Sequence, residues 1–158
     1  MEISLKRFNE LAQMPFKAYD GDFGNDVYAT SAEEISPGVW KYGIGWATEI
    51  NRDKVKLDEN TIIDLNNSEL LLSVDFRPRS SIYKFGMILS NSEPTIDEGY
   101  RNEISLVFYH FDKTKIPYKV GDRIAQMKIG ITIPLTFKEV DELSDSERGM
   151  RGLGSSGK

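Results

Sequence analysis

Apolar and β-branched residues come in short runs along this chain, and turn-forming residues separate one run from the next. Residues 1–8 (MEISLKRF) alternate apolar and polar positions, and residues 104–111 (ISLVFYHF) form the clearest strand pattern. Strands are expected at residues 1–8, 26–29, 39–50, 70–76, 104–111 and 123–133. No long segment has a helical period, and only residues 9–14 are predicted to form one short turn of helix. The pattern therefore predicts an all-β fold.

The composition is that of one folded domain. The chain has 158 residues, of which 39% are apolar and 28% are charged. Its net charge of −5 argues against direct nucleic-acid binding, for which a basic surface is more usual. It has no cysteine and no apolar run near the ~20 residues of a membrane span, so we expect a cytoplasmic protein with no membrane contact. We expect a β domain at residues 1–147 and a flexible Gly-rich C-terminal arm at 148–158.

Two stretches in predicted turns carry groups that suit phosphate chemistry. Arg79, Ser80 and Ser81 place a fork-shaped donor beside two hydroxyls, a combination that can bind phosphate oxygens. Asp97 precedes Tyr100 in a turn, where a carboxylate could act as a general base beside an aromatic platform. Each stretch taken alone is also what an ordinary solvated turn looks like.

The last eleven residues, RGMRGLGSSGK, have two interpretations of their own. Chain ends rich in Gly and Ser are often disordered. Glycines also let a backbone wrap closely round an anion, while Arg148, Ser155 and Ser156 could pair with phosphate oxygens. The single histidine, His110, lies within a predicted strand and is expected to be structural. The sequence has neither a Walker-type phosphate loop nor a G-x-G-x-x-G turn.

The order of these stretches is more specific than any one of them. Five segments resemble, in order, the five motifs of the trimeric dUTPase family. They are residues 24–29 (GNDVYA), 78–81 (PRSS), 91–101, 121–126 (GDRIAQ) and 147–157. The fourth matches closely, and the resemblance spans nearly the whole chain.

The resemblance implies a fold, a reaction and an assembly. Family members hydrolyse dUTP to dUMP and pyrophosphate. Their subunits are jelly-roll-like β-barrels that form homotrimers, and each active site lies between subunits. The Gly-rich tail of one subunit closes as a lid over the nucleotide in the site of another. The resemblance therefore implies that dUTP is the substrate, that copies of this chain are its partners, and that residues 148–158 form a mobile C-terminal lid.

The resemblance also implies a role for individual positions. Asp97 would be catalytic, because it would orient and deprotonate the water that attacks the α-phosphate. Tyr100 would pack under the deoxyribose and leave no room for a 2′-hydroxyl. Asp26 would reach a Mg²⁺ cofactor through metal-bound water. The positions implied to contact substrate are Arg79, Ser80, Ser81, Asn91, Thr95, Ile96, Asp97, Tyr100, Gln126, Arg148, Leu153, Gly154, Ser155 and Ser156.

Four departures from the family pattern stand out. Ser81 replaces a glycine of the second motif, and Pro94 and Asn102 replace glycines of the third. Leu153 replaces the phenylalanine that stacks over uracil, so weaker ordering of the tail is expected. Residues 53–73 are longer than expected between motifs and are interpreted as an insertion, either a surface loop or an arm that binds a partner.

Two alternative functions remain open at this point. The Arg79-Ser80-Ser81 triplet resembles the dCTP deaminase branch of the same fold. That branch carries a catalytic glutamate where this chain has Val107, and an arginine where it has Lys84. The other alternative is a dUTPase-like scaffold with a regulatory role, whose main task is to bind a partner protein. The presence of Asp97 beside Tyr100 argues for catalysis.

Overall fold

The computed structural model describes residues 1–56 and 60–152, and nearly all of its regular structure is β-strand. The strands are β1 (Glu2–Arg7), β2 (Asn25–Tyr28), β3 (Glu33–Ser36), β4 (Val39–Gly43), β5 (Trp46–Asn51), β6 (Lys54–Lys56), β7 (Ile62–Asp64), β8 (Leu71–Pro78), β9 (Met87–Leu89), β10 (Thr95–Asp97), β11 (Ser105–His110) and β12 (Arg123–Thr132). Two short 3-10 helices, η1 (Leu65–Asn67) and η2 (Ser80–Phe85), flank β8. The described residues contain no helix long and apolar enough to cross a membrane.

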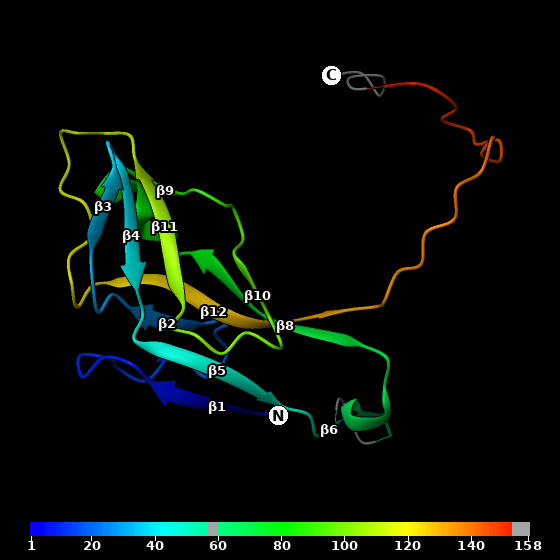
Figure 1. Cartoon of the computed structure of the whole chain (residues 1–158), viewed down its shortest axis with the longest axis horizontal. Helices are drawn as coiled ribbons and strands as arrows, with labels where there is room; N and C mark the ends of the chain where they lie inside the picture. The colour runs from blue at the N-terminus through cyan, green and yellow to red at the C-terminus, as the bar shows by residue number, and fades with distance from the viewer. Residues whose placement is uncertain (57–59, 153–158) are drawn as a thin grey trace.

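Two four-stranded antiparallel sheets form the body (Figure 1). One has the strand order β10-β8-β12-β2 and the other has the order β3-β4-β11-β9. A third, two-stranded sheet pairs β1 with β5, and a fourth pairs β6 with β7. Both large sheets bury apolar side chains in one core. The prediction of an all-β, jelly-roll-like fold is confirmed.

The core is filled by large side chains that alternate along the strands. On β8, Val74 and Phe76 are 1% and 0% exposed, as the period of a strand requires for inward positions. The rings of Tyr42, Phe108 and Tyr118 meet edge to face, with centroids 5.6–6.2 Å apart. This aromatic cluster joins β4, β11 and the loop before β12, so it fixes the position of the segment that carries the GDR turn.

The run predicted as one strand at residues 39–50 is two strands in different sheets. β4 ends at Gly43 and β5 begins at Trp46. Gly45 between them has φ +75°, and a Cβ there would lie 2.6 Å from the Cβ of Ala12. Only glycine fits both this backbone and this close contact, so the chain changes sheets at this residue.

Two further local predictions differ from the structure. Residues 9–14 contain a hydrogen-bonded turn, in which the Ala12 N–H donates to the Asn9 carbonyl over 3.0 Å, but no helix. The turn predicted around Asp97 and Tyr100 follows a short strand that the sequence did not indicate. This strand, β10, pairs with β8, where Thr95 and Asp97 have the register partners Asp75 and Ser73.

The predicted insertion at residues 53–73 includes β6, β7 and η1. Its last three residues belong to β8, where they pair with β12 up to Thr132. The segment that departs from the large sheets therefore ends near residue 70. That it is an insertion stays a prediction.

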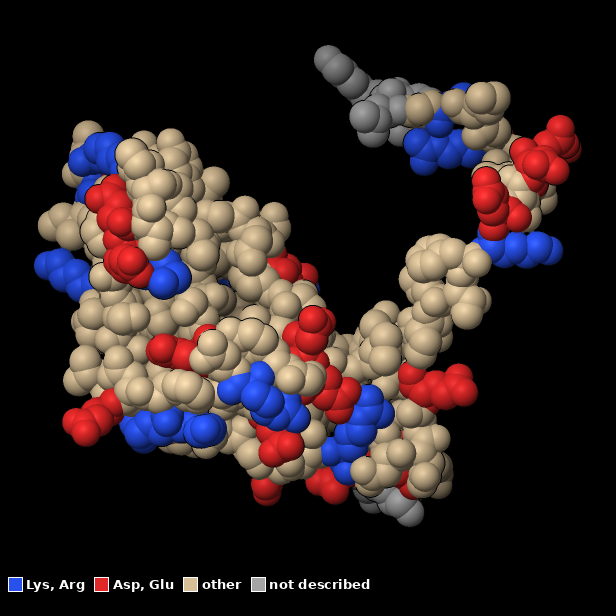
Figure 2. Space-filling model, viewed as in Figure 1, with Lys and Arg blue, Asp and Glu red and all other residues tan. Residues whose placement is uncertain are grey.

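Beyond β12 the chain runs away from the body as an extended arm (Figure 1). Every described residue from 131 to 152 is exposed. Figure 2 shows acidic and basic side chains interspersed on the visible face of the body, while acidic side chains precede the arginines along the arm. The apolar side chains of the described part of this arm are therefore open to solvent in the single chain.

Candidate functional site

A buried carboxylate lies between two arginines at one end of the β10-β8-β12-β2 sheet. Asp26 on β2 is 5% exposed. Its Oδ1 accepts a hydrogen bond from Nε of Arg79 over 3.1 Å, and its Oδ2 accepts one from a terminal nitrogen of Arg123 over 2.9 Å. One anion thus holds two cations, which leaves a net positive charge where the two guanidinium groups meet.

Strand pairing explains how these residues meet. Gln126 on β12 is the register partner of Asp26 on β2. The register of β12 against β2 shifts between Arg123 and Ala125, next to the position from which the Arg123 side chain reaches Asp26. Gly24 allows close approach here, because a Cβ at that position would lie 3.0 Å from the Cβ of Gln126.

Arg79 is the N-cap residue, directly before the helix η2. Its side chain makes no capping hydrogen bond to the helix. Ser80 and Ser81 form the first turn, with Ser80 exposed and Ser81 half-buried. Both serines thus follow directly on the residue that pairs with Asp26, and their role as phosphate donors stays a prediction.

The other predicted residues lie on β10 and the turns around it. Asp97, the last residue of β10, is exposed, and its carboxylate has no hydrogen-bond or ion-pair partner among the residues that the structure describes. A backbone hydrogen bond of 2.9 Å from Tyr100 to the carbonyl of Asp97 closes the turn that follows. Tyr100 is 40% exposed and donates from its hydroxyl to the carbonyl of Glu103 over 3.1 Å.

Asn91, Thr95 and Ile96 complete this group. Asn91 is exposed in the turn after β9, while Thr95 is exposed and Ile96 half-buried on β10. Pro94, which departs from the family pattern, is buried, and its carbonyl accepts from the N–H of Phe76 over 2.9 Å. Proline therefore fills a packed position here, and its missing N–H is no loss because only its carbonyl is used.

A polar network supports β10 from the strands beside it. Lys128 of β12 lies 2.6 Å from Oδ2 of Asp75, and the Ser73 hydroxyl donates to Oδ1 of Asp75 over 2.8 Å. Burial raises the pKa of Asp75, but hydrogen bonds from Lys128, Ser73 and Thr95 outweigh it, so the pKa lies below its ordinary value. The residues that pair with β10 are thus held in an ionised, hydrogen-bonded arrangement.

The structure does not bring the two groups together within one chain. Asp97 pairs with Ser73 near the start of β8, whereas Arg79 follows the end of β8. Six residues at ~3.3 Å each separate these two positions by about 20 Å along the strand. A general base must lie within hydrogen-bond reach of its water, so Asp97 cannot serve a phosphate held by Arg79 of the same chain.

The third predicted group lies on the arm. The Arg148 side chain donates to the carbonyls of Arg151 and Gly152 over 3.1 and 3.4 Å and contacts no residue of the body. The predicted residues Leu153, Gly154, Ser155 and Ser156 lie outside the described residues.

Sequence reasoning missed Arg123 as a site residue. The signal was present, since Arg123 is part of the GDRIAQ segment and follows a turn in which Gly121 has φ +92°. The sequence could not tell that its side chain crosses to Asp26, 97 positions away.

Among residues 1–56 and 60–152, no three His, Cys, Asp or Glu side chains come together as a metal site. Asp26 nevertheless fits an indirect role. A carboxylate has about four lone-pair positions, and the two arginines use one on each oxygen. The remaining positions can accept hydrogen bonds from metal-bound water.

Comparisons with known proteins point to one family. The dUTPase family model matches residues 72–157. The deoxyuridine 5'-triphosphate nucleotidohydrolase of Clostridium kluyveri is 38% identical over 158 residues, which cover 99% of this chain and 99% of that protein. The enzyme of the same name from Alkaliphilus metalliredigens is 35% identical over 98% of this chain and 96% of its own length.

Solved structures show the same fold. The dUTPase of Staphylococcus bacteriophage 80alpha, determined with dUpNHpp, superposes with a TM-score of 0.70 at 21% identity, covering 99% of both chains. A variant of the dUTPase from phage phi11 of S. aureus, whose structure reveals the coordination of a structural Mg(II) ion, has a TM-score of 0.65 at 15% identity over 92% of this chain and all of its own.

Proposed function

This chain belongs to the dUTPase family, and from that premise we propose that it hydrolyses dUTP to dUMP and pyrophosphate with Asp97 as the general base. The observation that carries the proposal is the state of Asp97. Its carboxylate is exposed at the end of a strand and has no partner in the described part of the chain, so it is available to accept a proton. Other carboxylates near the site, such as Asp26 and Glu98, are already paired with arginines.

The chemical step is a displacement at phosphorus. Asp97 takes a proton from a water molecule as the water oxygen forms a bond to the α-phosphorus. The bond from the α-phosphorus to the bridging oxygen breaks, and pyrophosphate leaves with that oxygen. Positioned proton transfer of this kind contributes roughly 10²–10⁴-fold to a rate.

We assign the phosphate chain to the cluster around Asp26. Arg79 and Arg123 share the single negative charge of Asp26, so together they keep a surplus positive charge for phosphate oxygens. The Ser80 and Ser81 hydroxyls and the Gln126 amide add uncharged donors beside them. Asp26 thereby holds both guanidinium groups in place before the nucleotide arrives, which reduces the entropy lost on binding.

We propose that the complete site forms between copies of the chain, in a homotrimer. The separation of about 20 Å along β8 supports this, because a second copy must bring its Asp97 to the Arg79 cluster of the first. The arm supports it as well. Ile131, Ile133, Leu135 and Phe137 alternate along the extended chain and are 54–92% exposed, the pattern of a strand that buries one face on another surface.

The end of the arm would then act at the site of another copy. Arg148, Ser155 and Ser156 are proposed to contact the terminal phosphate, and Leu153 to cover the uracil. Asn91, Thr95 and Ile96 would line the base pocket, and Tyr100 would pack under the sugar. Closure of the arm would exclude bulk water from the reacting phosphate.

Mg²⁺ is proposed to accompany the nucleotide. When bound, it supplies positive charge that neutralises the triphosphate. Asp26 would contact it through metal-bound water, while Arg79 and Arg123 keep their hydrogen bonds to the same carboxylate.

The test is pyrophosphate release by the purified protein with Mg²⁺, from dUTP and, as controls, from dCTP, dTTP and UTP. Release from dUTP alone is expected. Asp97→Asn should lower kcat by roughly 10²–10⁴-fold while a non-hydrolysable dUTP analogue still binds. Near-normal turnover by that variant would refute the role of Asp97 without touching the identity of the substrate.

The assembly has a separate test. Truncation after Thr132 removes the arm and should shift the protein toward monomers in sedimentation, with loss of dUTP hydrolysis. A truncated chain that stays trimeric would refute the proposal that the arm holds the copies together.

A further inference from the structure

Arg52 lies where three parts of the chain meet. It follows β5, and its guanidinium donates to Oε1 and Oε2 of Glu98 over 2.7 Å each, and to the carbonyls of Leu65 and Leu70 over 3.0 and 2.9 Å. One side chain therefore contacts the end of β5, the segment before β8 and the turn after β10. Arginine suits this place because its planar fork presents several donors in fixed directions.

Residues 53–70 form a segment outside the large sheets, which we call the excursion. Two of these hydrogen bonds hold its end close to its start. The chain leaves β5 beside Arg52 and returns to it through the carbonyls of Leu65 and Leu70. Leu65 is 1% exposed and anchors η1 in the core, and its N–H donates to the carbonyl of Asp53 over 3.3 Å. The end of the excursion is therefore held in place by the buried Leu65 side chain and by the hydrogen bonds from Arg52.

The other two hydrogen bonds hold the turn that follows Asp97. Glu98 is the next residue after Asp97, and it binds Arg52 with both carboxylate oxygens. The side chains are 25% and 29% exposed, so the pair is partly shielded from water. The hydrogen bond from Arg52 lowers the pKa of Glu98 below its ordinary value, which keeps this carboxylate ionised and paired.

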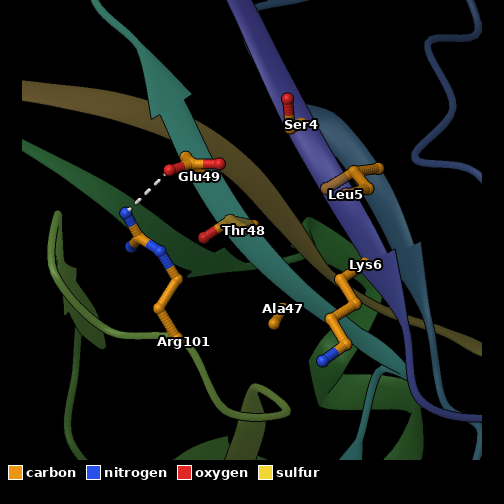
Figure 3. Close-up of a pocket in the computed structure, with 7 residues that line it drawn as sticks. All are labelled: Ser4, Leu5, Lys6, Ala47, Thr48, Glu49 and Arg101. Carbon is orange, nitrogen blue, oxygen red and sulfur yellow. Dashed lines mark hydrogen bonds and ion pairs between the residues drawn. The ribbon is translucent and has the colours of Figure 1, made fainter.

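Among the described residues, few other side chains contact the turn that follows Asp97. β10 is three residues long, and its pairing with β8 ends at Asp97 itself. Arg101 also reaches the turn, since it donates to the Glu98 carbonyl over 2.5 Å and pairs with Glu49 of β5 over 3.2 Å. Arg101 lines a cavity of about 250 Å³ together with residues of β1 and β5. Figure 3 shows its side chain extended toward Glu49.

The ion pairs made by the two arginines differ in how much they contribute to stability. The Arg101–Glu49 side chains are 50% and 57% exposed and share a single contact, an arrangement that contributes little. The Arg52–Glu98 pair is bidentate and less exposed, and bidentate pairs also fix orientation. Arg52 is therefore a two-point side-chain restraint on the residue after Asp97, beside the hydrogen bond from Arg101 to the Glu98 carbonyl.

We infer that Arg52, acting through Glu98, is a positioning residue for the catalytic Asp97, and that it ties the excursion at residues 53–70 to the active site. The inference rests on the proposed role of Asp97. It gives the excursion a function within this chain: its end supplies the carbonyls that orient the Arg52 fork. A displacement of the excursion would then change the placement of Asp97.

The experiment measures kcat and KM for dUTP in Glu98→Gln, Arg52→Lys, Arg52→Ala and the double variant Arg52→Ala/Glu98→Gln. A misplacement of about 1 Å can cost about 100-fold in rate. We expect Glu98→Gln and Arg52→Ala to lower kcat by about 10- to 100-fold, with KM changed less than about threefold. Arg52→Lys keeps the charge but loses the fork, so it should recover only part of kcat.

Because one contact links the two residues, the double variant should lose no more kcat than Arg52→Ala alone. Lys41→Ala is the matched control, since it breaks the exposed Lys41–Glu33 pair on β3 and β4 and should leave kcat unchanged. Thermal unfolding of each variant at one protein concentration separates loss of activity from loss of fold.

A normal kcat in folded Glu98→Gln and Arg52→Ala would overturn the inference. Losses of kcat that multiply in the double variant would also overturn it, because the two residues would then act independently. Measuring Asp97→Asn in the same series separates the role of Asp97 as general base from the positioning role of Arg52 and Glu98. If Asp97→Asn is inactive while the Arg52 and Glu98 variants are normal, the base is right and the positioning role is wrong.

Discussion

Two buried tyrosines in the aromatic cluster should respond in opposite directions to the same small change. Tyr42 and Tyr118 are 0% and 2% exposed, and their rings meet edge to face with centroids 6.2 Å apart. The Tyr42 hydroxyl donates to the backbone carbonyl of Tyr118 over 3.0 Å. The Tyr118 hydroxyl is buried without a partner among the described residues. Replacement by phenylalanine removes one oxygen at each position and leaves the ring packing unchanged.

The expected magnitudes follow from those partners. Tyr42→Phe removes a buried hydrogen bond and leaves the Tyr118 carbonyl without its donor, which costs about 1–3 kcal/mol of unfolding free energy. Tyr118→Phe removes a buried hydroxyl that no hydrogen bond compensates, so it should stabilise the protein by about 1 kcal/mol. In a chain of this length 1 kcal/mol corresponds to a change in Tm of about 2–4 °C.

The assay is thermal and urea unfolding of wild type and both variants at one fixed protein concentration. The concentration must be fixed because assembly adds to apparent stability. Intrinsic fluorescence of Trp40 and Trp46 reports the transition, and near-equal m-values would show that the unfolded states are comparable. The reasoning is wrong if Tyr118→Phe is destabilised as much as Tyr42→Phe, since the Tyr118 hydroxyl must then be hydrogen-bonded in the folded protein.

Burial raises the pKa of Tyr118 from its ordinary 10.0 to about 12, so the folded state keeps a proton that the unfolded state releases. Its contribution to stability should be complete below pH 10 and fall as the pH rises to about 12, and urea midpoints across that range should fall less steeply in Tyr118→Phe. Gly130→Ala should destabilise the fold by about 1–3 kcal/mol in urea unfolding, because a Cβ there would overlap the Asp75 carboxylate and the Ser73 hydroxyl; an unchanged midpoint would show that the Lys128–Asp75 pair can move aside. Leu153→Phe should lower KM for dUTP by restoring aromatic stacking, and an unchanged or higher KM would contradict that role.

Local signals in the sequence were sufficient for much of the fold. The alternation at residues 104–111 and 123–133 predicted β11 and β12 to within one residue at each end, because the period of a strand is written in consecutive residues. The same reasoning joined β4 and β5 into one strand. The break between them depends on the contact of Gly45 with Ala12, a residue 33 positions earlier.

Some residues of the candidate site could be predicted from the sequence, whereas the contacts between them could not. The order of the five motifs led to Asp97, Tyr100 and Arg79, since each motif is a short segment with its own chemistry. No local pattern indicated that Asp26 joins Arg79 to Arg123, or that Arg52 binds Glu98. These pairs lie 53, 97 and 46 residues apart.

What the sequence determined by itself is therefore the strand content, the turn chemistry and the family to which the chain belongs. The tertiary structure decided which carboxylates are paired, which one is left available, and how far Asp97 lies from Arg79. The physical reason is that period and turn type depend on neighbouring residues, whereas an ion pair depends on strand register and sheet order. Register and sheet order are fixed only when the two large sheets pack around their common core.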